Sequence, residues 1–219
     1  MIRVVPADEP ESFDEKVRQP GLRAIAQRVG EGRNLKGWKG RTLEKVAERR
    51  EELKSEHFPP YWREALPELL AAYHRICAYS CFYIERVTGG ASVDHFAPVS
   101  QAWDRVYEWS NYRLACALMN GRKRDFGSVL DPFEVEEGFF ALDLVNLKVV
   151  PGPRAGPKRK EIEKTIQILG LDGAEYRAAL EDYWEAYFEL GSSLRHIERR
   201  APFFASELRR QGRLRRGDV

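Results

Sequence analysis

The chain has 219 residues, of which 43% are hydrophobic and 32% are charged, as in a folded domain rather than a disordered segment. Its 36 Lys and Arg residues almost balance its 34 Asp and Glu residues, and the net charge is only +2. This balance excludes binding of nucleic acid through bulk positive charge, so any such binding must depend on where the basic residues lie.

Neither a membrane protein nor a secreted one is indicated. No apolar run approaches the ~20 residues that a membrane-spanning helix needs. The first residues, MIRVVPADEPESFDE, lack the basic start and apolar core of a signal peptide. The three cysteines, Cys77, Cys81 and Cys116, are an odd number and too few for a disulfide scaffold. We therefore expect a cytoplasmic protein with reduced thiols and no membrane partner.

The first sixty residues are predicted to be helical with interruptions. Short helices are expected over 11–17 and 20–29, with Pro20 suited to a helix start. The segment 30–41, GEGRNLKGWKGR, contains four glycines and predicts a flexible loop. The segment TLEKVAERREELKSE then predicts a charged helix with Thr42 as its N-cap.

The middle of the chain mixes helix and strand patterns. Apolar residues recur at helical spacing over 61–80 and predict a helix with a buried face. The runs CFYIERV and ASVDHFAP, separated by TGG, predict a hairpin. The segment 111–126 predicts a short strand that passes into a short helix, and 139–153 alternates as strands do.

A basic, linker-like segment, GPRAGPKRK, which includes Lys158, precedes three predicted helices over 161–169, 174–190 and about 193–211. The expected fold class is therefore α+β, a small β-rich centre inside helical flanks. We divide it into a helical N-terminal region (1–60), a central core (61–150) and a helical C-terminal region (151–219), which together form one compact unit.

Asp94 and His95 stand side by side in GGASVDHFAPVSQAW, and alone such a pair arises often by chance. Further polar residues follow, however. Asn111 lies sixteen residues after His95 in WSNYRLAC, and Asn120 and Lys123 follow in CALMNGRKRD. Four polar features in this order form a much more specific pattern than the pair alone.

The pattern VDHFAPVS…W.NYRLAC..MNGRK resembles the HNH, or ββα-metal, endonucleases, with asparagine in the third position. Its ending, from Asn120 to Lys123, is also similar to the HNH domains of RNA-guided CRISPR effectors. The similarity covers about residues 77–125, under a quarter of the chain. It implies a ββα-metal core in which His95 is the catalytic base, and in which Asn111 ties the loop after His95 to the second strand and orients the imidazole.

The chemistry of phosphodiester hydrolysis asks for these residue types independently, because it needs a water, a base and a cation. Asp94 and Asn120 offer oxygen ligands that suit Mg²⁺, with Mn²⁺ as a substitute. A histidine is largely neutral at pH 7 and can act as a general base. Lys123 is expected to be a catalytic residue together with His95 and Asn111, and with Arg122 and Arg124 it is expected to contact phosphate oxygens of nucleic acid. Arg122 and Arg124 could equally be a solvated helix end.

Many HNH proteins carry two C-x-x-C knuckles that bind a structural zinc. The corresponding segments read CAYS, from Cys77, and CALM, from Cys116, so each has lost its second cysteine. Even if Cys81 supplied one of the missing ligands, only three thiolates would be present for a tetrahedral site. We expect no structural zinc, and we expect Cys77, Cys116 and Met119 to be buried packing residues.

Two further features admit more than one interpretation. The aromatic segment WDRVYEW, 103–109, could stack on bases, but we expect it to pack beneath the metal loop. The arginine-rich C-terminus is equally compatible with contact to nucleic acid or a partner and with a soluble helix end. Its arginines are Arg195, Arg199, Arg200, Arg209, Arg210, Arg213, Arg215 and Arg216.

More loosely, FPPYWREAL, LACALMNGRK, LDPFEV and ELRRQGRL resemble HNH nucleases of bacterial anti-phage defence, of the Septu type and of retron systems. This implies an ATPase partner. The leading hypothesis is a metal-dependent endonuclease that cuts DNA as the effector of a defence complex. The alternatives are an RNase, for example a tRNA-cleaving one, with the same site, or a non-catalytic module that binds nucleic acid.

Overall fold

The computed structural model describes residues 1–31 and 42–218, and within them the fold is α+β, as predicted. The helices are α1 (Gln19–Arg28), α2 (Leu66–Ala72), α3 (Ala117–Lys123), α4 (Arg159–Leu169), α5 (Ala174–Phe188), α6 (Leu194–Arg200) and α7 (Pro202–Arg210). Shorter helical segments are the π-helical Asp14–Arg18 and the 3₁₀ turns Arg50–Glu52, Ser55–His57, Tyr61–Ala65, Trp103–Arg105, Trp109–Asn111 and Gly156–Lys158. The strands are β1 (Ala91–His95), β2 (Tyr112–Cys116), β3 (Phe140–Asp143) and β4 (Lys148–Pro151).

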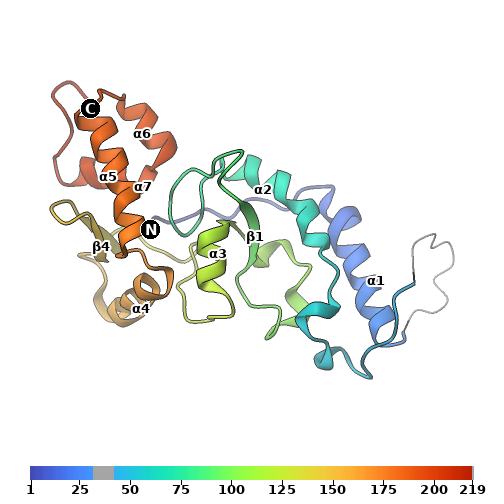
Figure 1. The fold of residues 1–219 in the computed structure, drawn as a ribbon. Coiled ribbons are helices and arrows are strands. Elements are labelled where there is room, and N and C mark those ends of the chain that lie inside the picture. Colours follow the sequence, from blue (N-terminus) through green and yellow to red (C-terminus); the bar gives the residue numbers. More distant parts are fainter. Residues whose placement is uncertain (32–41, 219) are drawn as a thin grey trace.

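The centre of the molecule is the antiparallel pair β1–β2, which α3 follows directly in the chain. In this pair Asp94 lies opposite Arg113, and His95 lies opposite Tyr112. Figure 1 shows α1 and α2 on one side of this centre and α4 to α7, with the β3–β4 hairpin, on the other. The predicted strand-to-helix passage in 111–126 and the predicted strands in 139–153 are thus confirmed.

The predicted hairpin between 81–87 and 91–98 is wrong. Within 81–87 there is no strand, and the segment takes part only in an isolated bridge between Ile76 and Tyr83. Cys81 has a positive φ of 57°, which turns the chain back so that Phe82 pairs with the residues just before it. This local turn satisfies the backbone of the segment, and β1 pairs with β2 instead.

Two helix predictions also need correction. The helix expected over 61–80 ends at Ala72, since His74 and Arg75 adopt left-handed backbone angles. The segment 42–56 contains only 3₁₀ turns, and Thr42 caps no helix. Its amide groups at Val46 and Ala47 instead donate to the carbonyl of Arg28, the last residue of α1. The segment therefore satisfies a helix-end carbonyl that α1 leaves free.

The three predicted C-terminal helices are present, but the last is split into α6 and α7. The break falls at Ala201, whose φ of −145° is not helical and which precedes Pro202. A proline disfavours helical angles in the residue before it and has no N–H to continue the helix. The predicted loop at 30–41 lies almost wholly outside the described residues.

One buried cluster includes residues of all three predicted regions. Phe13 of the N-terminal region contacts Trp109 and Tyr112 edge-on, with ring centres 5.6 and 5.7 Å apart. In the C-terminal region the carboxylate of Glu207 accepts the amide of Leu142 at 2.7 Å. No helix in the described ranges is long and apolar enough to cross a membrane.

Several C-terminal arginines form ion pairs within the chain. These pairs are Arg200–Glu85, Arg209–Glu198, Arg210–Glu207 and Arg215–Asp218. In addition, the Arg215 guanidinium donates to the carbonyls of Tyr187 and Ser192, so it holds the end of the chain against α5. For these four residues the structure favours the helix-end interpretation over a free basic surface.

A buried ion pair fixes β2 to the segment that follows α3. The guanidinium of Arg113 binds the carboxylate of Asp131 through two hydrogen bonds of 2.8 and 2.5 Å and lies 3.5 Å from the ring centre of Phe133. Arg113 is only 3% exposed. A buried charge of this kind depends on its partner for compensation.

We predict that Asp131→Ala lowers the free energy of unfolding by about 3–5 kcal/mol, because it leaves a buried guanidinium unpaired. Urea denaturation measures this loss. The control is Glu163→Ala, which breaks the exposed i,i+4 pair with Arg159 and should cost about 0.5 kcal/mol. Equal losses in the two variants would show that the Arg113–Asp131 pair does not anchor β2.

Candidate functional site

A cavity of about 300 Å³ opens where β1, α3 and the loop after β1 meet. It brings together sequence-predicted site residues from two distant parts of the chain, His95 from β1 and Asn120 and Arg124 from α3 and the residue after it. Asp94 lines the same cavity. The remaining lining residues are Ser55, Trp62, Val93, Pro98, Val99 and Asp125.

The His95 ring is held in one orientation. Its Nε2 atom lies 2.9 Å from the carbonyl oxygen of Val106, and the rings of Trp62 and Tyr112 contact it edge-on. Because a carbonyl can only accept, Nε2 must carry the hydrogen, and the neutral ring keeps its lone pair on Nδ1. Burial lowers the pKa of His95 to about 4, against the raising effect of the Val106 bond and with a further contribution from the charge of Lys123. The neutral, proton-accepting form therefore prevails at pH 7.

Asp94 is a buried carboxylate with both oxygens engaged. The hydroxyl of Tyr79 donates to Oδ2 at 2.5 Å, and the ammonium of Lys123 donates to Oδ1 at 3.1 Å. Burial raises the pKa of Asp94, and the charge of Lys123 and the Tyr79 hydrogen bond oppose that rise. Each carboxylate oxygen has two lone pairs, so each can accept one further bond.

The basic residues of α3 lie differently from expectation. Lys123 is fully buried, and its ammonium donates to Asp94 and to the carbonyl of His95 at 2.9 Å, so it is not a surface contact for phosphate. Arg122 lies on another face of the helix, where it binds Glu175 and the carbonyl of Leu169. Only Arg124 lines the cavity. Arg122 and Lys123 diverge because neighbouring residues of a helix point about 100° apart. Arg124 follows the end of α3, where the backbone leaves helical angles with a φ of 44°.

Asn111 is fully buried and joins two loops. Its Oδ1 accepts the amide of Ala97 at 2.8 Å, and its Nδ2 donates to the carbonyls of Ala97 and Arg105, each at 3.1 Å. Asn111 thus ties the loop after His95 to the start of β2. It also fixes the carbonyl next to Val106, the residue that binds the His95 ring.

The amide of Asn120 is oriented by its neighbours. The hydroxyl of Ser92 donates to the carbonyl of Ala115, so it must accept from Asn120 Nδ2, at 3.1 Å. The Oδ1 atom of Asn120 therefore remains available as a ligand. Together with Asp94 it forms a pair of oxygen donors on one cavity, which suits a hard cation that keeps most of its waters. The ammonium of Lys123, next to Asp94, opposes that binding.

The described residues contain no group of three His, Cys, Asp or Glu side chains placed to hold a metal ion. Any cation in the cavity would thus be held by fewer than three such side chains, and the amide of Asn120 offers a further oxygen ligand. Cys77 and Met119 are buried packing residues, as predicted, whereas Cys116 is only partly buried. In the aromatic segment 103–109, Tyr107 and Trp109 are buried, which agrees with the predicted packing role.

Sequence reasoning did not identify three residues of this site. Tyr79 lies in the CAYS segment, where only the cysteine and serine drew attention, and no local pattern links it to a carboxylate 15 positions away. Trp62 lies in a predicted helix, and Asp125 follows the basic run of α3 without a recognisable spacing.

No protein-family model matches the chain, and a search of proteins with curated descriptions finds no significant match.

We predict that Asn111→Ala lowers the free energy of unfolding by about 2–4 kcal/mol, because partly buried backbone groups at Ala97 and Arg105 lose their partners. Chemical denaturation measures the loss. The matched control is Asn146→Ala, at an exposed turn where the amide binds Asp143, which should cost at most about 0.5 kcal/mol. If Asn111→Ala were as mild as the control, the amide would not be what holds the loop.

Proposed function

We propose that the chain is a metal-dependent endonuclease of the HNH type that hydrolyses phosphodiester bonds, with DNA as its substrate. One observation carries the proposal. His95, whose Nδ1 is left as the proton acceptor, lines the same cavity as Asp94 and the free oxygen of Asn120. The order of β1, β2 and α3 along the chain agrees with the ββα core that the sequence resemblance implies.

Each residue has a distinct role in this proposal. Nδ1 of His95 accepts the proton of the attacking water, since Nε2 is already committed to Val106. Asp94 and Asn120 would hold a Mg²⁺ or Mn²⁺ ion, which supplies stabilisation of the negative charge that builds on the phosphate. Arg124, which directly follows α3, lines the cavity and is placed to bind a phosphate oxygen. Asn111 is a positioning residue.

The distribution of charge supports dependence on a partner. Much of the arginine content of the C-terminus is neutralised by internal ion pairs, and Lys123 is buried. Non-specific affinity for DNA grows with the number of phosphates that a protein neutralises. The isolated chain should therefore hold DNA weakly. An ATPase partner in a defence complex, as the looser resemblance implies, remains a prediction of this proposal.

A second candidate function has a specific observation in its favour. The ammonium of Lys123 occupies one oxygen of Asp94, at 3.1 Å, where a metal ion would otherwise supply the positive charge. If that ion pair persists, the cavity holds no cation and the chain is a non-catalytic module that binds nucleic acid. Direct measurement of metal binding separates the two candidates.

The test of the nuclease is cleavage of plasmid DNA, single-stranded DNA and total RNA, each with and without Mg²⁺. We expect DNA to be cut only with metal, and we expect His95→Ala to be slower by about 10²–10⁴-fold, since only the general base is lost. His196→Ala, at an exposed position on α6, is the matched control and should retain activity. A His95→Ala variant as active as this control would remove His95 from the mechanism, and cleavage of RNA alone would indicate the RNase alternative.

Metal binding can be measured without any substrate. Calorimetric titration of the protein with Mn²⁺ should show one site, weakened at least ~10-fold in Asn120→Ala, because one of two protein ligands is lost. Asn146→Ala again serves as the control, with unchanged affinity. Absence of Mn²⁺ binding in the wild-type protein would favour the non-catalytic module, and unchanged binding in Asn120→Ala would contradict the role of Asn120 as a metal ligand.

A further inference from the structure

Two cysteines that are distant in sequence lie close together at the start of α3. The sulfur of Cys77 accepts the backbone amides of Ser80 and Cys116, at 3.5 and 3.4 Å, so the Cys116 side chain begins next to this sulfur. The third cysteine, Cys81, is also buried, and its backbone amide donates to the carbonyl of Cys77. The side chains of Cys77 and Cys116 are neighbours at the Cys77 sulfur, and we call these two residues the thiol pair.

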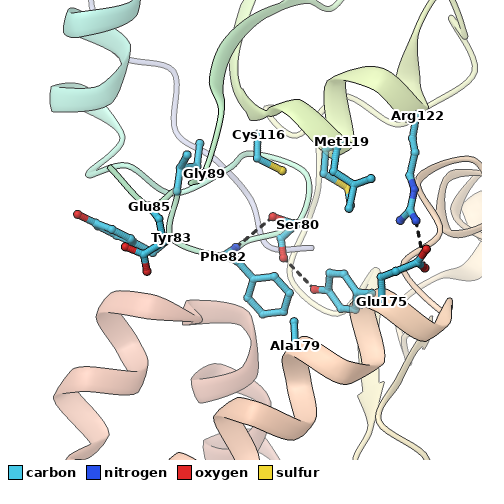
Figure 2. A pocket seen from close by; sticks show the side chains of 13 residues that line it. Ser80, Phe82, Tyr83, Glu85, Gly89, Cys116, Met119, Arg122, Glu175 and Ala179 are labelled. Carbon is cyan, nitrogen blue, oxygen red and sulfur yellow. Dashed lines mark hydrogen bonds and ion pairs between the residues drawn. The ribbon is translucent and has the colours of Figure 1, made fainter. Parts of the chain in front are cut away.

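A cavity leads to this pair. It has a volume of about 170 Å³ and lies between α3, the segment 80–89 and α5. Figure 2 shows the Cys116 sulfur at this cavity, near Met119 and Ser80, with the ring of Phe82 on the far side. Most of the wall is apolar, so the cavity admits small neutral molecules better than ions. Cys81 does not line it and is 1% exposed.

We propose that Cys77 and Cys116 are a redox modification site, at which a hydroperoxide that enters this cavity converts the two thiols to a reversible disulfide. A disulfide requires side chains that point toward each other at close range. The backbone nitrogen of Cys116 lies 3.4 Å from the Cys77 sulfur, which places the two side chains next to each other. The inference is independent of the proposed nuclease activity.

The thiolate is the reactive form of cysteine. Burial raises the pKa of Cys77, but hydrogen bonds from the Cys116 thiol and from Ser80 outweigh it, so the net shift is downward. The hydrogen bond to Cys77, together with burial, raises the pKa of Cys116. The pair thus loses its first proton more readily than an isolated thiol does.

The reaction balances with peroxide as the oxidant. The Cys116 sulfur, which faces the cavity, attacks one peroxide oxygen while its proton passes to the Cys77 thiolate. The O–O bond breaks, hydroxide leaves and takes a proton from solvent, and Cys116 becomes a sulfenic acid. The Cys77 sulfur then displaces the hydroxyl group from Cys116, and its proton leaves with that group as water. Both sulfurs are oxidised, and one peroxide is reduced to two waters.

The bond would join the turn before β1 to the start of α3, since Cys116 is the residue that precedes that helix. It closes a loop that contains all of β1 and most of β2. A cross-link over a loop of this length constrains the unfolded chain, and we expect the oxidised protein to melt about 5–10 °C higher than the reduced protein.

The test treats the reduced, full-length protein with hydrogen peroxide, then unfolds it in the presence of an alkylating agent. We expect the intact mass to fall by two hydrogen atoms before alkylation, one thiol to be alkylated instead of three, and dithiothreitol to restore all three. Peptide mapping should link Cys77 to Cys116 and find Cys81 alkylated. Cys81→Ser should form the same bond, and Cys116→Ser, at a partly buried position that tolerates the change, should form none.

Two results would overturn the inference. One is three alkylated thiols after peroxide treatment of the wild-type protein, which would mean that the pair does not react. The other is a bond between Cys77 and Cys81, which would mean that the turn opens and that the cavity does not select Cys116. Both readouts use the wild-type protein, so they hold even if a cysteine variant fails to fold.

Discussion

The buried carboxylate of Asp94 is the constraint on which the centre of the molecule depends. Its two oxygens are bound by Tyr79, from the turn before β1, and by Lys123, from the end of α3, and the carboxylate itself belongs to β1. Three segments are thus joined at one buried charged group, which is only 3% exposed. Removal of either partner from a buried ion pair leaves a charge without compensation, which typically costs about 3–5 kcal/mol. The same interaction also tunes the candidate site, since the cation beside Asp94 is an ammonium that any metal ion must compete with.

The helix α3 connects two regions of different chemistry. Toward β1 it presents Asn120 to the polar cavity that holds His95, and on another face Met119 and Arg122 line the apolar cavity beside Cys116. The helix α3 has only seven residues, and Asn120 lies about one turn from its start. A bond at Cys116 and a cation at Asn120 would therefore act on the same short rigid element, although each is inferred from separate contacts.

Orientation at the candidate site comes largely from backbone carbonyls and uncharged side chains. The carbonyl of Val106 sets the tautomer of His95, the hydroxyl of Ser92 sets the amide of Asn120, and Asn111 holds the loop between them. Such partners leave the functional atoms free while they fix their direction. This explains why a cavity with few charged residues still presents a proton acceptor and two oxygen donors in one place.

The sequence by itself determined the α+β class, the C-terminal helices, the passage from strand to helix after Asn111, and the spacing that marks Asp94, His95 and Asn120 as candidates. These features depend on local periodicity or on residue type, which a single sequence displays directly. Only the tertiary structure decided that β1 pairs with β2, that 42–56 binds the end of α1 instead of forming a helix, and that Lys123 turns inward to Asp94. In each case a contact between two distant segments satisfies a backbone or charged group. The outcome depends on contacts between residues far apart in the chain, whose energies no local pattern contains.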